Sequence, residues 1–398
     1  MTKLSSIADY VTDKISSNDI ALREYVTTDC ILQNKKGREI ATNLPPQSCC
    51  LTRYQHGDVL IANIRPYLKK VWFADIDGGA SSDVLVFRAK EGHSPSFLYA
   101  VLLQDSFFDY VMQGAKGSKM PRGDKEQILR YEMPTLSCSE ESIGTFFLNL
   151  DQKIRLNEQI NQNLEAMAKQ LYDYWFVQFD FPNEEGKPYK SSGGEMVWNE
   201  KLKRNIPVGW HCGNLFEIAV FTNGLACQKF RPKDDEVPLP VIKIREMHDG
   251  ISVDTEEVTS NIPESVKVYN GDVLFSWSAS LEVMLWAYGL GGLNQHIFKV
   301  TSANDFPKSF YYFQLLDYVD VFKKMAEARK TTMGHITQDH LQQSTIAIPD
   351  NKDIADKFEE LISPIFKQIV KLQEEISNFI KQCDELLPLL MNGQITIE

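Results

Sequence analysis

The chain has 398 residues, 43% hydrophobic and 24% charged, which suits two or three globular domains. It has no apolar run near the roughly 18 residues of a membrane span and no apolar signal region at its start. Its seven scattered cysteines form no C-x-x-C pair, which favours neither a disulfide framework nor a zinc site, so we expect a reduced, cytoplasmic protein.

The net charge of −12 argues against DNA as a partner, because phosphate binding needs lysine and arginine. Two segments differ from this average. Residues 112–130 hold five basic and two acidic side chains, and residues 321–338 hold four basic and one acidic, so each is net +3. Both are either solvated loops or phosphate-binding loops, and their matched positions in a repeat, described below, favour the second interpretation.

Residues 1–138 are predicted to form a first α/β domain. Residues 58–62 and 84–87 have strand character, Gly78-Gly79 is predicted to punctuate between them, and residues 97–112 have the pattern of one helix. If this domain binds DNA, its candidate contacts divide by chemistry into base-reading Asn63, Arg65 and Tyr67 and phosphate-binding Lys116, Lys119 and Arg122.

Residues 139–180 are predicted to be a central helical spacer, with a helix from Ser142 to about Phe176. Two heptad-spaced columns follow it: Ile143, Leu150, Asn157, Leu164 and Leu171, and Phe147, Ile154, Asn161, Ala168 and Trp175. This 4-3 spacing is typical of a coiled-coil seam. Asn157 and Asn161 interrupt the seam, and we expect them to fix the helix register at a cost in stability. Residues 181–208, rich in Pro, Gly and Ser at their start, are predicted to be a non-helical linker.

Residues 209–350 repeat the first domain. Gly57-Asp58-Val59-Leu60 returns as Gly271-Asp272-Val273-Leu274, and Phe97-Leu98-Tyr99 returns 213 residues later as Phe310-Tyr311-Tyr312. Strands are predicted at residues 273–275 and 296–300 and a helix at 310–325. Trp72 and Trp286 are expected to be core residues rather than base-stacking platforms. Two similar domains suit a partner that itself repeats, such as duplex DNA. The candidate DNA contacts of this second domain are Arg245, Asn294, Gln295, Arg329, Lys330, Thr332 and His335.

Residues 351–392 carry a second seam and are predicted to form a C-terminal helical spacer that pairs with residues 139–180. Its columns are Phe358, Ile365, Leu372, Phe379 and Leu386, and Ile362, Ile369, Ile376, Cys383 and Leu390. An antiparallel pair is the economical arrangement, and two unrelated core helices are the alternative. At Ser363-Pro364 the helix is expected either to kink or to begin again. A seam of about 34 residues spans roughly 50 Å. That length predicts a DNA site with a nonspecific spacer of about 5–8 base pairs.

The central segment resembles the specificity subunits of type I restriction-modification systems. The resemblance is carried by the stretch Leu171-Tyr172-Asp173-Tyr174-Trp175-Phe176-Val177-Gln178-Phe179-Asp180-Phe181-Pro182, and by the two Gly-Asp-Val-Leu motifs with Ser81-Ser82-Asp83 and Leu293-Asn294-Gln295-His296-Ile297-Phe298. It implies two target recognition domains in tandem, of α/β (α+β) class, separated by a long antiparallel two-helix coiled coil that sets the spacer. The loop at Met120 departs from the Thr/Ile-rich form that Met333-Gly334-His335-Ile336-Thr337 keeps.

The resemblance further implies that each domain reads half of a bipartite DNA site. Two modification subunits then carry the adenine-N6 methylation with S-adenosylmethionine, and restriction subunits use ATP and magnesium. The chain itself is expected to bind no cofactor or metal and to be no enzyme, since it lacks a phosphate-binding loop, a G-x-G-x-x-G fingerprint and an Asn-Pro-Pro-Tyr motif. The alternatives are a coiled-coil scaffold whose duplicated domains bind protein, and a standalone nuclease.

Overall fold

The computed structural model describes residues 2–133, 139–233, 235–278, 280–328, 336 and 338–396, without the side chains of 325–328. The chain divides into two compact units. Unit 1 is Met1–Arg155 with Asn378–Glu398, and unit 2 is Leu156–Ser377. Among the described helices, none is both long and apolar enough to cross a membrane.

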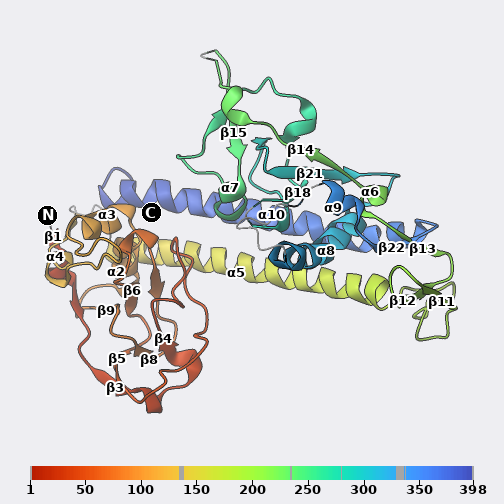
Figure 1. The fold of residues 1–398 in the computed structure, drawn as a ribbon. Helices are drawn as coiled ribbons and strands as arrows, with labels where there is room; N and C mark the ends of the chain where they lie inside the picture. The colour runs from red at the N-terminus through yellow and green to blue at the C-terminus, as the bar shows by residue number, and fades with distance from the viewer. Residues whose placement is uncertain are drawn as a thin grey trace. The chain divides into compact units, whose positions relative to one another are not determined.

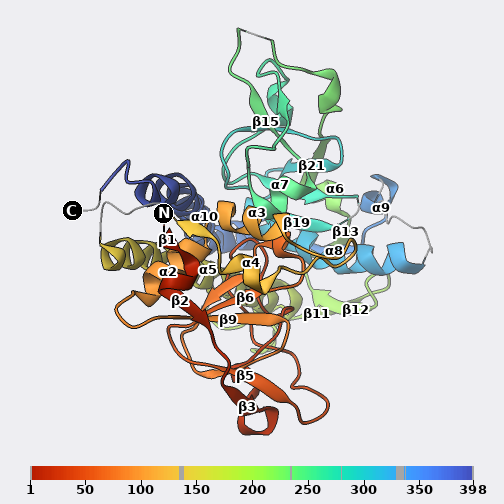
Figure 2. The same ribbon diagram turned by 90° about the vertical axis from the view of Figure 1, so that its left-hand side faces the viewer.

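Unit 1 contains two four-stranded sheets, with strand orders β2-β9-β6-β7 and β3-β5-β8-β4, and a two-stranded pair β1-β10 (Figures 1 and 2). Apolar residues on the facing sides of the sheets, including Leu60 and Trp72, form one buried cluster. The strands are β1 (Thr2–Lys3), β2 (Ala8–Tyr10), β3 (Lys14–Ser16), β4 (Tyr25–Val26), β5 (Cys50–Tyr54), β6 (Val59–Ala62), β7 (Val71–Phe73), β8 (Gly78–Ala80), β9 (Val84–Ala89) and β10 (Glu132–Met133).

Four short helices accompany these sheets: α1 (Leu4–Ile7), α2 (Pro95–Leu102), α3 (Asp105–Gln113) and α4 (Lys125–Ile128). The prediction of a single helix at residues 97–112 is therefore wrong, because the helix is interrupted between α2 and α3. Gln104 is extended there, with φ −65° and ψ 139°. Asp105 then begins α3 and accepts ion pairs from Lys35 and Lys69, each at 2.9 Å. Those ion pairs form across the fold, and the local apolar pattern could not predict them.

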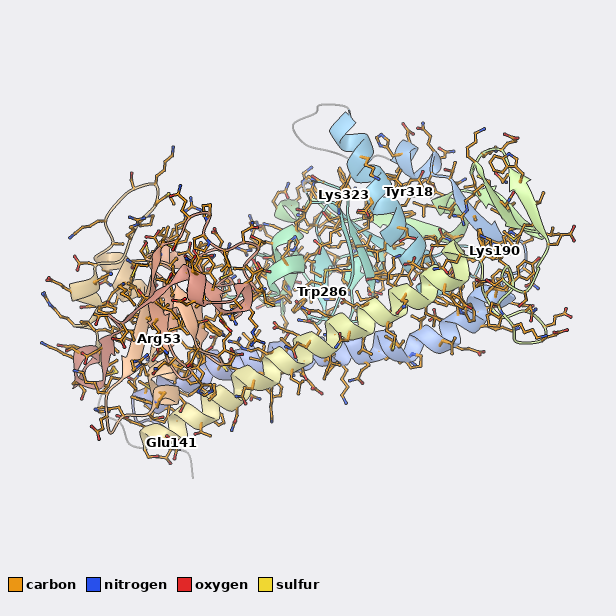
Figure 3. All side chains as sticks on the ribbon, turned by 90° about the horizontal axis from the view of Figure 1, so that it is seen from below. Arg53, Glu141, Lys190, Trp286, Tyr318 and Lys323 are labelled. Carbon is orange, nitrogen blue, oxygen red and sulfur yellow. The ribbon has the colours of Figure 1, made fainter. Side chains whose placement is uncertain are left out.

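Unit 2 repeats the plan, with sheets β14-β21-β18-β19 and β16-β15-β20-β17 and the pair β13-β22. The strands are β13 (Trp210–Gly213), β14 (Ala219–Asn223), β15 (Leu239–Ile242), β16 (Glu257–Val258), β17 (Lys267–Val268), β18 (Val273–Ser276), β19 (Glu282–Leu285), β20 (Gly291–Leu293), β21 (Ile297–Ser302) and β22 (Ile346–Pro349). The helices are α6 (Leu215–Ile218), α7 (Ile244–Asp249), α8 (Lys308–Ala328) and α9 (Gln338–Gln342). The first sheet and the two-stranded pair therefore repeat in topology. The second sheet repeats in three strands, since β15, β20 and β17 match β4, β8 and β5, but its fourth strand pairs with β5 in unit 1 and with β15 in unit 2. The two tryptophans, Trp72 and Trp286, are 1% and 0% exposed and belong to the cores, as predicted. Trp286 is labelled in Figure 3.

The paired glycines are strand residues, so the predicted punctuation at Gly78-Gly79 is wrong. Gly79 lies in β8 between β5 and β4, and Gly292 lies at the matching place in β20. A Cβ atom on Gly79 would come within 2.9 Å of Leu51 Cδ1, and one on Gly292 within 2.5 Å of Val258 Cγ1. Glycine is needed at both places because a neighbouring side chain packs directly on the backbone.

The aspartate of each Gly-Asp-Val-Leu motif accepts hydrogen bonds that stabilise the local fold. The Asp58 carboxylate is 2% exposed, accepts the Gln55 amide at 2.8 Å, and accepts Arg88 Nε and Nη2 at 2.8 and 2.7 Å. The hydrogen bond to Asp58 raises the pKa of Arg88. Asp272 repeats the arrangement, accepting the Tyr269 amide and pairing with Lys299 at 2.8 Å. Each motif therefore closes a turn and binds a cation from the adjacent strand.

The two long helices, α5 (Glu140–Tyr172) and α10 (Asp353–Met391), pair in antiparallel fashion within each unit (Figure 1). In unit 1 the start of α5 shares a buried cluster with the end of α10, including Ile143, Phe147 and Leu390. In unit 2 the end of α5 shares a cluster with the start of α10, including Ala168 and Phe358. The predicted seams are confirmed as the buried faces. Helix α10 continues through Pro364, so no new helix begins at Ser363.

After α5, a π-helix η4 (Asp173–Val177) leads into a hairpin of β11 (Met196–Asn199) and β12 (Arg204–Pro207). This hairpin lies inside the predicted linker, which is non-helical as expected but more ordered. Aromatic residues fill the space around it. The Phe181 and Trp210 rings stack at 5.7 Å, and Phe176 contacts Phe358 of α10 at 5.0 Å. The aromatic motif thus anchors the end of α5 to the start of α10.

We predict that Asp58→Ala destabilises unit 1 by about 2–3 kcal/mol, because it leaves a buried amide and the Arg88 guanidinium without their acceptor. Asp9→Ala removes an exposed ion pair with Lys90 (3.2 Å, Asp9 66% exposed) and should cost less than about 0.5 kcal/mol. Urea denaturation of both variants measures the difference. Equal losses of stability would show that the buried carboxylate has no special role.

Candidate nucleic-acid interface

In unit 1 the structure brings the two sets of candidate residues together. The loop at 116–122 forms isolated β-bridges from Lys116 to Arg122 and from Ile64 to Arg122. The Arg65 amide donates to the Pro121 carbonyl at 2.8 Å. Residues 63–67 and 116–122, far apart in sequence, therefore form one surface, which we call the unit 1 ladder.

Most side chains of the unit 1 ladder are accessible. Tyr67 is 51% exposed, and Arg65 and Lys119 are also exposed. Lys116 pairs with Asp124 at 2.9 Å and Arg122 with Asp83 at 3.1 Å, although these cations are 83% and 58% exposed. Exposed ion pairs are weak, so a phosphate can compete for both cations. The ladder thus presents four cations and one aromatic ring to solvent.

Asn63 has a different role. Its Nδ2 donates to the Gly123 carbonyl at 3.3 Å, and the Gly123 amide donates back to the Asn63 carbonyl at 3.3 Å. Its Oδ1 is buried and has no partner among the described residues. Asn63 therefore lies on the inner side of the ladder, where its hydrogen bonds to Gly123 join the two segments.

Unit 2 has a hydrogen bond that corresponds to the one between Gly123 and Asn63. The Ile336 amide donates to the Trp277 carbonyl at 3.0 Å, as the Gly123 amide does to Asn63. Lys323 lies near the end of α8, ahead of the candidate loop (Figure 3). The candidates Arg329, Lys330, Thr332 and His335 lie outside the described residues.

The other three candidates of unit 2, Arg245, Asn294 and Gln295, have different surroundings. Asn294 is 7% exposed and its Oδ1 accepts the His296 amide at 3.3 Å. Arg245 of α7 pairs at 2.7 Å with Glu246, a carboxylate that is 1% exposed. Arg245 therefore neutralises a buried charge, and Asn294 supports its loop. Gln295 alone approaches an exposed polar group, with its Nε2 3.3 Å from His296 Nε2.

Sequence reasoning missed a group around Gln295. Trp277 Nε1 donates to Asn223 Oδ1 at 3.3 Å, and the Trp277 ring lies 5.6 Å from the His296 ring. We call Asn223, Trp277, Gln295 and His296 the Trp277 cluster. The signal for it was available, since Trp277 follows Asn63 by 214 residues, as Gly271 follows Gly57.

The two register asparagines sit differently in the helix pair. Asn157 Nδ2 donates to Glu375 Oε2 of α10 at 3.2 Å. Asn161 is 7% exposed, and its Oδ1 has no partner among the described residues. Asn157 thus joins the two helices, whereas Asn161 is a buried polar interruption. In the described part of the chain, no group of His, Cys, Asp and Glu is arranged to bind a metal ion.

Comparisons with known proteins agree with this architecture. Residues 207–394 match the family model of the type I restriction modification DNA specificity domain. The chain is 23% identical over 397 residues to the type I restriction enzyme MjaIX specificity subunit of Methanocaldococcus jannaschii, covering 96% of this chain and 87% of that protein. It is 22% identical over 441 residues to the type I restriction enzyme HindI specificity subunit of Haemophilus influenzae, covering 93% and 94%.

The fold is similar to the crystal structure of the S subunit of a type I restriction-modification system from M. genitalium. The TM-score is 0.59 at 11% identity, and the match covers 100% of this chain and 96% of that chain.

We predict that Asn161→Leu stabilises the chain by about 1–2 kcal/mol, because it removes a buried carbonyl oxygen that lacks a hydrogen bond. Asn157→Leu should not stabilise it, since that change leaves Glu375 without its donor. Thermal unfolding of the two variants gives the comparison, and an equal effect at both positions would contradict the assignment.

Proposed function

We propose that the chain is a specificity subunit of a type I restriction-modification system and that it reads a split, asymmetric DNA site, with one half recognised by each unit. The match of residues 207–394 to the DNA specificity domain and the similarity to two curated specificity subunits support the first part. The observation that carries this proposal is the duplicated topology. One four-stranded sheet has the same strand order in both units, β2-β9-β6-β7 and β14-β21-β18-β19. In each unit the carbonyl directly after the strand of the Gly-Asp-Val-Leu motif accepts an amide hydrogen bond, from Gly123 to Asn63 in unit 1 and from Ile336 to Trp277 in unit 2. Loops at matched places on a common framework are suited to reading different bases.

In unit 1 the ladder supplies both kinds of contact. Lys116, Lys119 and Arg122 suit phosphates, which give affinity and orientation without sequence information. Arg65 and Tyr67 are placed beside them on an exposed turn, and an arginine fork matches the guanine edge. Asp83 and Asp124 hold Arg122 and Lys116 in place until DNA replaces them.

In unit 2 we assign base reading to the Trp277 cluster. The Gln295 amide is suited to the adenine edge, and the Trp277 and His296 rings offer apolar contact to a thymine methyl group. Arg329, Lys330, Thr332 and His335 are proposed as further contacts, since they precede Ile336 in the sequence and the Ile336 amide donates to the Trp277 carbonyl. The two units thus present different chemistry from equivalent places, which fits an asymmetric site.

We assign to α5 and α10 the spacing of the half-sites and the docking of two methyltransferase subunits. In unit 2, α5 exposes Leu156, Ile160 and Met167 to 56%, 36% and 51%, and their spacing puts them on one side of the helix. Such exposed apolar side chains suit a protein partner. Catalysis, with S-adenosylmethionine, and ATP and magnesium for restriction, is assigned to the partner subunits.

We predict that Lys119→Ala and Arg122→Ala each weaken DNA binding about equally for all sequences. Each should also reduce the slope of log affinity against log salt by about 1, because one phosphate contact is lost. Lys203→Ala, on the hairpin, has the same charge change and should have no effect. Fluorescence anisotropy of the complex with methyltransferase subunits measures all three. Affinity that is independent of salt would favour a protein-binding scaffold instead.

We also predict that deleting residues 154–160 of α5 together with 372–378 of α10 alters only the spacer. The two segments face each other, since Asn157 contacts Glu375 and Lys153 lies over the Phe379 ring. Removing one heptad shortens the helix pair by about 10 Å, which corresponds to roughly three base pairs. Because the DNA helix turns over those base pairs, one of the two reading surfaces then meets the duplex from a different direction. Sequencing of methylated adenines in a host strain identifies the new site. Changed half-sites with an unchanged spacer would refute the spacing role.

A further inference from the structure

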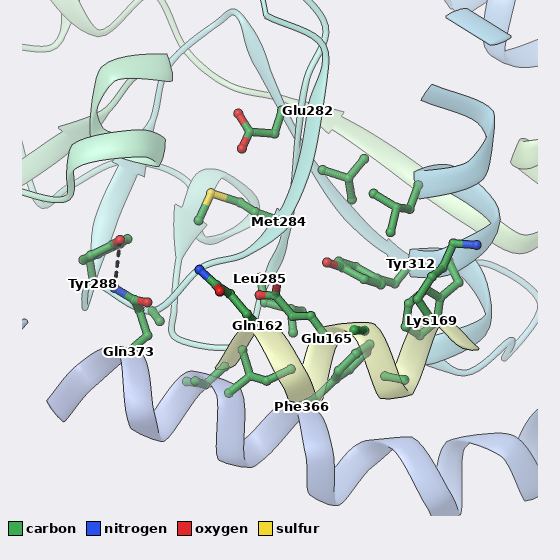
Figure 4. A pocket seen from close by; sticks show the side chains of 18 residues that line it. Gln162, Glu165, Lys169, Glu282, Met284, Leu285, Tyr288, Tyr312, Phe366 and Gln373 are labelled. Atoms are coloured by element: carbon green, nitrogen blue, oxygen red, sulfur yellow. Dashed lines mark hydrogen bonds between the residues drawn. The ribbon is translucent and has the colours of Figure 1, made fainter. Parts of the chain in front are cut away.

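Unit 2 contains a cavity of about 590 Å³ bounded by α5, β19, α8 and α10 (Figure 4). Its wall is half apolar, through Leu285, Phe366 and Ile369, and half polar, through Glu165, Glu282 and Tyr312. The volume falls within the range of roughly 300–1,000 Å³ typical of small-molecule sites. The candidate DNA contacts do not line it, and of its lining residues only Ala168 and Ile369 belong to the helix seams.

The polar part of the wall is anionic. In the described part of the chain, the Glu165 carboxylate has no hydrogen-bond or ion-pair partner, and Glu282 pairs only with His248, at 3.1 Å. Solvent reaches Glu165, but desolvation by neighbouring side chains still raises its pKa. Lys169 does not offset these charges, because it pairs with Asp173 at 2.5 Å and with Asp317 at 3.0 Å.

The charges of the Glu165 and Glu282 carboxylates both influence the Tyr312 hydroxyl. Tyr312 points into the cavity from α8 (Figure 4). Burial raises its pKa, and the charges of Glu165 and Glu282 add to this effect. The three groups therefore surround one volume, and a cation placed there would meet two carboxylates and an aromatic ring.

The duplicated unit shows what fills this place elsewhere. Tyr99 is the counterpart of Tyr312, and Arg155 Nη2 donates to its hydroxyl at 3.5 Å. Arg155 Nε also donates to Asp151 Oδ2 at 2.8 Å. Unit 1 therefore carries its own guanidinium against the tyrosine.

In unit 2 that guanidinium is missing. The helix seams begin at Ile143 and Phe358, 215 residues apart, so the counterparts of Asp151 and Arg155 are Phe366 and Val370. Both line the cavity. Phe73, next to Tyr99 in unit 1, is replaced by the smaller Leu285 in unit 2. Unit 2 therefore lacks the Asp151–Arg155 ion pair, and Glu165 and Glu282 face the cavity without an equivalent guanidinium.

We propose that this cavity binds a linear aliphatic polyamine. Its ammonium groups pair with Glu165 of α5 and Glu282 of β19, and its methylene chain lies against Leu285, Phe366 and Ile369. A bound polyamine joins the helix pair to the sheet of unit 2, as Arg155 joins α5 to Tyr99 in unit 1. Binding therefore stabilises unit 2 in proportion to ligand concentration.

Isothermal calorimetry of the full chain with spermidine tests the proposal. We expect saturable binding at one site, weakened by at least about tenfold in the double variant Glu165→Gln, Glu282→Gln, because charge-assisted hydrogen bonds are lost. The control is Glu185→Gln, Glu200→Gln, which makes the same charge change at carboxylates 70% and 78% exposed, and it should bind as the unaltered chain does. Equal weakening by both double variants would mean nonspecific attraction to an acidic protein and would overturn the proposal.

A second variant approaches the question from the other side. Val370→Arg puts a guanidinium at the position that Arg155 occupies in unit 1, and it should abolish spermidine binding while the circular dichroism spectrum stays unchanged. Val370→Met, of similar bulk but uncharged, should weaken binding less. Full binding by Val370→Arg, or no saturable binding by the unaltered chain, rejects the cavity as a polyamine site.

Discussion

The pairing of α5 with α10 in one register is the constraint on which the rest of the structure depends. Neither unit completes its core with a continuous stretch of chain. Unit 1 needs Ile143 and Phe147 from the start of α5 together with Leu390 from the end of α10. Unit 2 needs Ala168 from the end of α5 and Phe358 from the start of α10. A slip of one helix would expose apolar surface in both units, so packing itself opposes it. The Asn157–Glu375 contact adds a directional preference.

The two units agree where packing requires it and differ in their loops. Asp58 and Asp272 keep their turn, and Gly79 and Gly292 keep their close approach. The loop after the first strand of each motif has changed, with eight residues between β6 and β7 and five between β18 and β19. The residue of this loop whose carbonyl accepts an amide hydrogen bond is Asn63 in unit 1 and Trp277 in unit 2. A shared frame with altered loops thus gives the two units different exposed surfaces.

Much of the architecture could be predicted from the sequence, because heptad spacing and duplication are local or repeated signals. The two helices, their buried faces and the resemblance to specificity subunits are confirmed. Features decided by distant contacts could not be read. Gly78-Gly79 forms a strand because β5 pairs with it. The interruption of the helix before Asp105 depends on the ion pairs of Asp105 with Lys35 and Lys69. The same limit applied to the candidate site. Composition singled out Arg245 and Asn294, but only the fold shows that Arg245 neutralises Glu246 and that Asn294 is buried, and it brings Trp277 to Gln295.

Footprinting of the assembled complex on its own methylation site tests most directly whether two modules on one helical frame read two DNA segments. Hydroxyl-radical cleavage should reveal two protected blocks separated by an accessible spacer. Replacing residues 63–70 with a loop from another specificity subunit should change the sequence under one block and leave the other intact. One continuous protected block, or a change under both blocks after that single replacement, would contradict a division of recognition between the units.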